Sequence, residues 1–220
     1  MKRYSRNMNM LSAEENASLS KYKACIVGCG GLGGYIIEML ARLGIGHLTV
    51  VDGDVFEESN LNRQLLSDME SLGKSKALVA KDRISRVNPL IRVKAISERL
   101  TKDNGFEILA GHDVIVDALD SIETRLLIQK QAEELNIPLV HGAIAGWYGQ
   151  VTTIFPGDKT LDLLYSNSGN RGLETELGNP SFTPALVASI EVSEVLKILI
   201  NRGDLLRRKL LIVNTLNQEY

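Results

Sequence analysis

Short apolar runs alternate with helix-like segments along the first two thirds of the chain. Runs rich in aliphatic and β-branched residues occupy positions 24–27, 48–51, 91–95, 114–116 and 138–140. Between them, apolar residues recur at helical spacing after position 31, from about 74 to 87 and from 122 to 135. Asn88-Pro89 is expected to end the second of these helices. Short strands without internal alternation are typical of a parallel sheet covered on both faces, so the pattern predicts a doubly wound α/β fold.

The last third of the chain has a different pattern. Residues 150–155 alternate in the manner of an antiparallel or edge strand, and residues 209–213 are expected to pair with them. A helix is predicted to start at Pro184, with one apolar face formed by Ala188, Val192, Val195 and Leu199. On this helix Glu191, Glu194 and Lys197 are expected to face solvent. The sheet is therefore predicted to be mainly parallel, with antiparallel strands in its C-terminal part.

Composition narrows the class of protein. The chain has 220 residues, 44% of them hydrophobic, and a net charge of -2 with a pI near 6.0. Nucleic-acid binding is not favoured, because this net charge gives no basic field and the lysines and arginines are scattered. No apolar run approaches the roughly 18 residues of a membrane span, so we expect no membrane association and a cytoplasmic location. Cys25 and Cys29 are the only cysteines, which excludes a disulfide framework.

A glycine-rich turn joins the first strand to the first helix. It reads Gly28-Cys-Gly30-Gly31-Leu-Gly33-Gly34. Residues without a Cβ allow backbone N–H groups at a helix N-terminus to approach phosphate oxygens closely. Taken alone, the turn fits an ATP site and a dinucleotide-dependent oxidoreductase about equally well.

The residues after the second strand distinguish these two sites. Asp52 and Asp54 end that strand, Asn60-Leu-Asn-Arg63-Gln64 follows, and Lys76 starts the next helix. If the pocket binds ATP, Asp52 accepts hydrogen bonds from ribose while Arg63 and Lys76 hold the phosphates. Asp120, after the fourth strand, would carry Mg²⁺, because the carboxyl ends of parallel strands share one edge of a sheet. A hydride-transfer site needs no triphosphate clamp, so ATP is favoured.

Together these motifs resemble the MoeB/ThiF/HesA family, bacterial relatives of the ubiquitin-activating enzymes. The likeness runs from Arg3-Tyr-Ser-Arg6 to about Ile200, and positions 28–34, 52–64, 73–76 and 116–120 carry its specific parts. The resemblance implies an ATP-dependent adenylyltransferase that acts on the C-terminal glycine of a ubiquitin-like sulfur carrier and releases pyrophosphate. The product would serve molybdopterin, tungstopterin or thiamine biosynthesis.

The same resemblance implies roles for individual residues. It implies catalytic roles for Arg6, Arg63, Lys76 and Asp120, with Arg6 acting on the site of the partner subunit in a homodimer. The expected nucleotide-binding residues are Gly30, Gly31, Gly33, Asp52, Asp54, Asn60, Arg63, Gln64, Lys76, Asp120 and Ser121. Asp120 is the expected metal ligand.

The sequence departs from the family pattern at three points, and these limit which properties of the family can be expected of this chain. Ser121 stands where asparagine is common. The paired Cys-X-X-Cys motifs that bind a structural zinc in many members are missing, so zinc is expected to be absent. No cysteine lies in the loop at 157–180, so the chemistry is expected to stop at the acyl-adenylate and to require a separate sulfur donor.

One adenylation domain is predicted for residues 1–220. Residues 1–20 would form an N-terminal arm, extended from Arg3 to Met10, and a short helix started by a Ser12–Glu15 capping box. Residues 21–145 would form the nucleotide-binding, Rossmann-like half and residues 146–220 the C-terminal half. The Gly-, Asn- and Ser-rich loop at 157–180 is interpreted as a lid.

Other interpretations stay open at this point. The runner-up is an NAD-dependent oxidoreductase, and the rival from another class is a catalytically idle module that only binds a carrier. Asp54 and Asp117 are as consistent with loop support as with ligand contact. The three histidines, including His141, receive no role.

Overall fold

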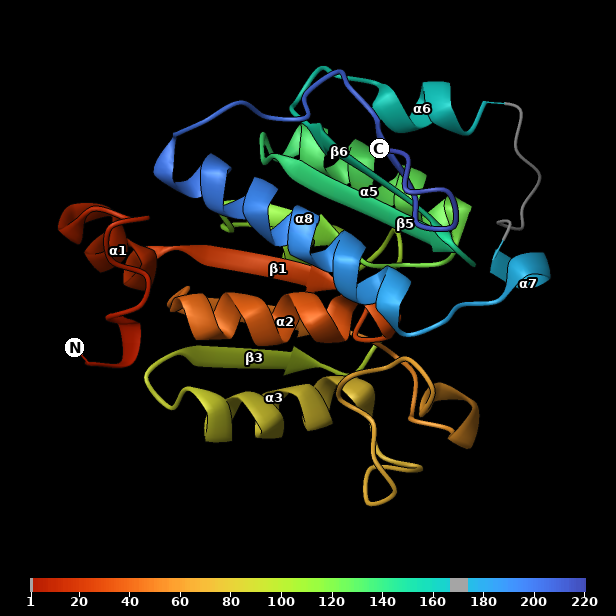
Figure 1. Ribbon diagram of the computed structural model, residues 1–220, viewed down its shortest axis with the longest axis horizontal. Helices are drawn as coiled ribbons and strands as arrows, with labels where there is room; N and C mark the ends of the chain where they lie inside the picture. The colour runs from red at the N-terminus through yellow and green to blue at the C-terminus, as the bar shows by residue number, and fades with distance from the viewer. Residues whose placement is uncertain (1, 167–173) are drawn as a thin grey trace.

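The computed structural model describes residues 2–166 and 174–220, which fold around one seven-stranded sheet (Figure 1). The strand order is β3-β2-β1-β4-β5-β6-β7. Strands β1 to β5 are parallel, whereas β6 pairs antiparallel with both β5 and β7. The predicted mixed sheet is thus confirmed. The strands are Lys23–Val27, His47–Val51, Arg92–Ile96, Val114–Asp117, Leu139–Ala145, Tyr148–Ile154 and Leu211–Asn214, numbered β1 to β7.

Helices cover both faces of the sheet. On one face α2 (Gly31–Leu43), α3 (Lys76–Val87) and α8 (Phe182–Ile200) enclose the larger apolar core. On the other face α4 (Gly105–Leu109), α5 (Ile122–Glu134) and α6 (Thr160–Leu164) enclose a second core. The remaining helices are α1 (Ala13–Ser18), α7 (Glu174–Leu177) and the 3₁₀ turns η1 (Lys2–Tyr4), η2 (Leu19–Lys21) and η3 (Glu58–Asn60). This is the two-sided arrangement that the apolar strands predict.

Local capping explains where the helices begin. The Ser75 side chain accepts a hydrogen bond from Leu78 N, so α3 begins at Lys76 rather than two residues earlier. The predicted Ser12–Glu15 capping box is present at α1. Helix α8 begins at Phe182, two residues before the predicted start at Pro184, because proline is tolerated in the first helical turn.

The expectation that Glu191 and Glu194 face solvent is wrong. Their side chains are buried, because α8 packs against both α2 and the strands β5 and β6 instead of presenting a free outer face. Glu194 Oε2 accepts hydrogen bonds from Thr153 Oγ1 at 2.5 Å and from Leu206 N at 2.8 Å. Lys197 is partly buried and forms an ion pair with Glu194.

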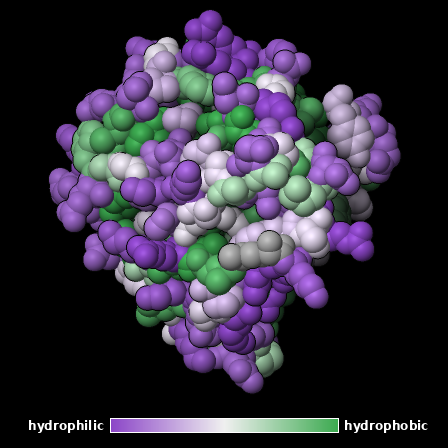
Figure 2. Space-filling view, turned by 90° about the vertical axis from the view of Figure 1, so that its left-hand side faces the viewer, coloured by the Kyte–Doolittle hydropathy of each residue, from purple (hydrophilic) through white to green (hydrophobic). Residues whose placement is uncertain are grey.

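The N-terminal arm is not extended as predicted. It forms η1 and a series of turns at the N-terminal end of the sheet (Figure 1). Asn88 Nδ2 donates to the Tyr4 hydroxyl at 2.8 Å, and Arg3 Nη1 donates to Val87 O at 2.6 Å. Figure 2 views this end of the molecule, where hydrophilic residues predominate between smaller hydrophobic groups. The arm is therefore docked on its own chain.

The segment at 157–180 contains α6 and α7, with residues 167–173 outside the described part. The lid prediction falls in part on those residues and stays a prediction. In the described part of the chain, no helix is both long and apolar enough to cross a membrane.

Candidate nucleotide site

A pocket of about 570 Å³ lies at the carboxyl ends of the parallel strands. The glycine turn between β1 and α2 forms the floor of this pocket. At two positions of the turn the backbone geometry leaves no room for a residue other than glycine. Gly28 has φ +102°, and a Cβ on Gly33 would fall 1.8 Å from Gly28 O. The turn can therefore bring the N-terminus of α2 to the pocket, where backbone N–H groups and the helix dipole favour an anion.

Asp52 ties this turn to the end of β2. Its Oδ2 accepts from Cys29 N at 2.8 Å, and its Oδ1 accepts from Asp54 N at 2.8 Å. Each carboxylate oxygen can still accept a second hydrogen bond. Asp52 is therefore a fixed acceptor on the pocket wall, as a ribose contact requires.

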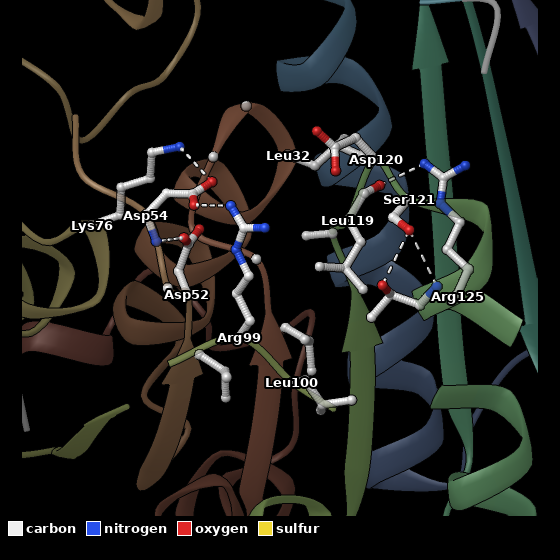
Figure 3. Close-up of a pocket in the computed structure, with 18 of the residues that line it drawn as sticks. Leu32, Asp52, Asp54, Lys76, Arg99, Leu100, Leu119, Asp120, Ser121 and Arg125 are labelled. Carbon is white, nitrogen blue, oxygen red and sulfur yellow. Dashed lines mark hydrogen bonds and ion pairs between the residues drawn. The ribbon is translucent and has the colours of Figure 1, made fainter. Parts of the chain in front are cut away.

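On the same side of the pocket as Asp52, the Asp54 carboxylate lies next to two cationic side chains (Figure 3). Lys76, at the first residue of α3, places Nζ 3.9 Å from Asp54 Oδ2, and Arg99 Nη2 donates to Asp54 Oδ1 at 2.9 Å. This hydrogen bond raises the pKa of Arg99. Arg63 also lines the pocket and donates from Nη1 to Ser59 O at 2.9 Å.

Charges of opposite sign are matched around the wall. Among the described lining residues, the acidic side chains are Asp52, Asp54, Glu98 and Asp120, and the basic ones are Arg63, Lys76, Arg99 and Arg125. An entering triphosphate would therefore compete with Asp54 for Lys76 and Arg99.

Asp120, Ser121 and Arg125 lie across the pocket from Asp54 and Lys76 (Figure 3). Ser121 is the N-cap of α5 and accepts from Thr124 N at 3.3 Å. One turn into the same helix, Arg125 Nη2 donates to Leu119 O at 2.5 Å. The β4–α5 connection places Asp120 on this wall, and the first turn of α5 places Arg125 there.

A buried polar cluster lies beneath that wall. Arg125 Nη1 donates to the Tyr165 hydroxyl at 3.0 Å, and this hydroxyl lies 3.2 Å from His141 Nε2. His141 Nδ1 in turn lies 2.7 Å from Asp117 Oδ2. Burial lowers the pKa of His141 despite the neighbouring Asp117, and it raises the pKa of Tyr165. Both side chains are therefore neutral near pH 7.

The structure brings most of the predicted nucleotide-binding residues together. The predicted residues on the pocket wall are Gly30, Gly31, Asp52, Asp54, Arg63, Gln64, Lys76, Asp120 and Ser121. Gln64 Oε1 is buried there without a hydrogen-bond partner among the described residues, so it can accept from a ligand.

Gly33, Asn60 and Arg6 lie elsewhere. Gly33 supports the turn from behind, and Asn60 Oδ1 accepts from Glu57 N, at the residue before η3, at 3.1 Å. Arg6 is exposed in the N-terminal arm, at the opposite end of the sheet from the pocket. It cannot reach the pocket of its own chain in this arrangement.

Several pocket residues were not anticipated from the sequence. Arg99 and Leu100 enter from the segment after β3, and Arg125 enters from α5. The sequence position of Arg125 could have indicated its place in the pocket, because it lies one helical turn after Ser121, the capping residue that follows β4. For His141 the signal was a polar residue inside an otherwise apolar run, which in a buried strand requires a hydrogen-bond partner.

The described residues contain no group of three or more His, Cys, Asp or Glu arranged to hold a metal ion. Asp120 nevertheless lines the pocket, and Mg²⁺ in nucleotide sites is commonly held by one or two carboxylates together with phosphate oxygens and water. The residues present are therefore compatible with Mg²⁺ that arrives with the nucleotide.

Comparison with known proteins identifies the family. The ThiF family model matches residues 4–220. The chain belongs to the ThiF family. This membership agrees with the resemblance to the MoeB/ThiF/HesA group that the motifs indicate.

Two relatives match nearly the whole chain. A SAMP-activating enzyme E1 of Haloferax volcanii is 35% identical, and the match covers 99% of this chain and 83% of the relative. A sulfur carrier protein adenylyltransferase of Thermus thermophilus is 36% identical, with coverage of 99% and 84%.

Solved structures share the fold. PaaA superposes with a TM-score of 0.83 at 23% identity, covering 99% of this chain and 71% of PaaA. The tRNA N6-threonylcarbamoyladenosine dehydratase TcdA of E. coli, solved in complex with ATP, gives a TM-score of 0.77 at 24% identity, covering 91% of this chain and 94% of TcdA.

Proposed function

We propose that this protein uses ATP to adenylate the C-terminal carboxylate of a ubiquitin-like sulfur carrier protein. ThiF family membership and the relatives that are named as activating and adenylyltransferase enzymes support this function. The observation that carries the proposal is the pocket itself, which joins the glycine turn to Asp52, Lys76 and Asp120.

In this proposal different pocket residues contact different parts of the nucleotide. Asp52 accepts from the ribose hydroxyls, and the backbone at Gly30 and Gly31 contacts the phosphates. Arg63 and Lys76 neutralise the triphosphate, for which each must exchange its present contact with Ser59 O or Asp54. Asp120 would hold Mg²⁺, which supplies further neutralisation of the phosphate charge when bound.

The reaction is a displacement at phosphorus. A carboxylate oxygen of the carrier attacks the α-phosphorus and forms the acyl–phosphate bond, while the bond from the α-phosphorus to the bridging oxygen breaks. Pyrophosphate leaves with that electron pair. The carboxylate is already ionised at neutral pH, so the chain needs to align the reactants and stabilise charge rather than supply a base.

A separate sulfur donor would then attack the acyl carbon and release AMP. The cysteines of this chain are Cys25 and Cys29, and both are buried. Burial raises the pKa of each thiol, to about 12 for Cys25. Neither thiol is suited to carry sulfur or a thioester.

A homodimer would complete the site. Arg6 is exposed in the N-terminal arm and lies far from the pocket of its own chain, so a role at the pocket requires a neighbouring subunit. In the proposal, Arg6 of each subunit contacts the polyphosphate bound by the other.

The test is Mg²⁺-dependent ATP–pyrophosphate exchange with each ubiquitin-like carrier of the same organism. A carrier without its terminal glycines is the control. Exchange with one intact carrier establishes the reaction and identifies the pathway. ATP binding without exchange on any carrier would contradict the proposal and favour a module that binds a carrier without activating it.

A further inference from the structure

The buried cluster beneath Asp120 has no part in the reaction described above. Two donors converge on the Tyr165 hydroxyl, namely Arg125 Nη1 at 3.0 Å and Gln150 Nε2 at 3.2 Å. The same hydroxyl lies 3.2 Å from His141 Nε2. Asp117 and His141 are fully buried, and Arg125 is 5% exposed. Such a cluster is stable only when each polar atom finds a partner.

The chemistry of the donors fixes the direction of every hydrogen bond. Guanidinium and amide nitrogens can only donate, so the Tyr165 oxygen accepts from Arg125 and Gln150. The hydroxyl hydrogen must then be donated to His141 Nε2, which is therefore unprotonated. The imidazole proton lies on Nδ1 and is donated to Asp117 Oδ2 at 2.7 Å.

Arg125 connects this cluster to the pocket. Its guanidinium donates one hydrogen bond from Nη1 to the Tyr165 hydroxyl and another from Nη2 to Leu119 O. Asp120 follows Leu119 directly in the sequence. The aromatic ring of Tyr165 also lies 5.7 Å from the guanidinium carbon. Arg125 Nε also lies 3.9 Å from the buried carboxylate of Asp117, so Tyr165 supplies one of several contacts that fix the guanidinium on the wall beside Asp120. The opposite wall, with Asp52 and Lys76, lies across the pocket (Figure 3).

We propose that Tyr165 and His141 are positioning residues that hold the Arg125 guanidinium on the pocket wall beside Asp120. The catalytic consequence rests on the adenylation function proposed above. The structural part does not, because the tautomer and its dependence on Tyr165 can be observed without any substrate.

The first test is the tautomer of His141 in the ¹⁵N-labelled protein, measured by long-range proton–nitrogen correlation spectra. The expected result is the Nδ1–H tautomer, with a hydrogen-bonded Nε2 whose shift changes in Tyr165→Phe. An Nε2–H tautomer in the wild-type protein would overturn the proposal, because Nε2 could not then accept from Tyr165.

The second test separates turnover from nucleotide binding. Tyr165→Phe should lower the rate of carrier-dependent exchange about tenfold, the scale of losing one hydrogen bond to a charged group. The Kd for ATP alone should be unchanged. Tyr22→Phe is the matched control, because the Tyr22 hydroxyl makes no side-chain hydrogen bond in the described part of the chain. An unchanged exchange rate, or a loss of ATP affinity together with Tm, would refute a positioning role.

Two substitutions of His141 refine the test. Gln places an oxygen near the Nε2 position and can still accept from Tyr165, whereas Asn places its amide near Nδ1 and cannot. His141→Gln is therefore expected to retain more exchange activity than His141→Asn. The reverse order would contradict the proposal. A wild-type protein that exchanges with no carrier would instead count against the adenylation function, while the tautomer result would stand.

Discussion

Gly142 in β5 lies against the carboxyl group of Glu191 in α8, so that a Cβ on Gly142 would fall 2.4 Å from Glu191 Cδ. Both carboxyl oxygens of Glu191 are buried without a hydrogen-bond partner among the described residues. Burial, reinforced by the charge of Asp117, raises the pKa of Glu191 well above its ordinary value. The buried position therefore favours the protonated, neutral form of this glutamate in the folded protein.

Glu191→Gln should change how stability depends on pH. In the wild-type protein the unfolded chain ionises Glu191 above about pH 4.5 while the folded chain keeps it protonated, so the free energy of unfolding falls as pH rises from there. Gln cannot ionise. Urea unfolding at several pH values should show that the free energy of unfolding of the variant increases relative to that of the wild type from pH 4.5 upward. A pH-independent difference would show that Glu191 is ionised in the folded state.

Asp158 is expected to show the opposite dependence. Hydrogen bonds from Arg207 and Arg208, with one from Phe155 N, lower the pKa of Asp158 to about 2. The stabilisation is present above the ordinary value of 3.8 and is lost as pH falls toward 2. Asp158→Asn should lower the free energy of unfolding at pH 7 by about 1 to 2 kcal/mol, allowing for solvent screening at the exposed arginines. Asp103→Asn, at an exposed position, is the control, and equal effects of the two changes would contradict this account.

Removing a phosphate-facing cation should reduce adenylation strongly. Arg63→Ala and Lys76→Ala are each expected to lower the exchange rate by roughly 10²-fold, the scale of losing one group that stabilises developing charge. Lys81→Ala, on the exposed side of the same helix α3, should leave the rate unchanged. Wild-type rates in both pocket variants would exclude a phosphate clamp.

Mixed subunits should reveal whether Arg6 acts across a dimer. Arg6→Ala and Asp120→Ala proteins are each expected to be inactive alone. A heterodimer of the two contains one site with both groups intact, so part of the exchange activity should return. Confirmed heterodimers without recovery would place the whole site within one chain.

The sheet could be predicted from the sequence because its strands carry a strong local signal. The runs at 24–27 and 114–116 are apolar on both faces, and this pattern is produced by helices on both sides. The environment of α8 could not be predicted in the same way. Its glutamates recur at spacings that normally indicate an exposed face, and only the tertiary contacts with α2 and β5 bury them.

The pocket residues differ in the same way, because a local sequence motif predicts some of them and not others. Asp52 and Arg63 belong to the motif at 52–64 and Lys76 to the next one at 73–76, and these local motifs predicted them, as they predicted the glycine turn. Arg99 was missed because it follows β3, a strand that meets the site only through sheet order. Tyr165 and His141 were missed because their roles depend on a contact between segments that are distant in the sequence.

The matched charges around the pocket bear on how fast nucleotide enters it. A wall that carries four acidic and four basic side chains projects little net field beyond its rim, and exposed charges are screened over roughly 10 Å in ordinary buffer. Attraction at long range therefore contributes little to capture of the polyanion. The association rate constant for ATP should vary only weakly with ionic strength, and selectivity would arise after encounter, when the triphosphate replaces Asp54 as the partner of Lys76 and Arg99.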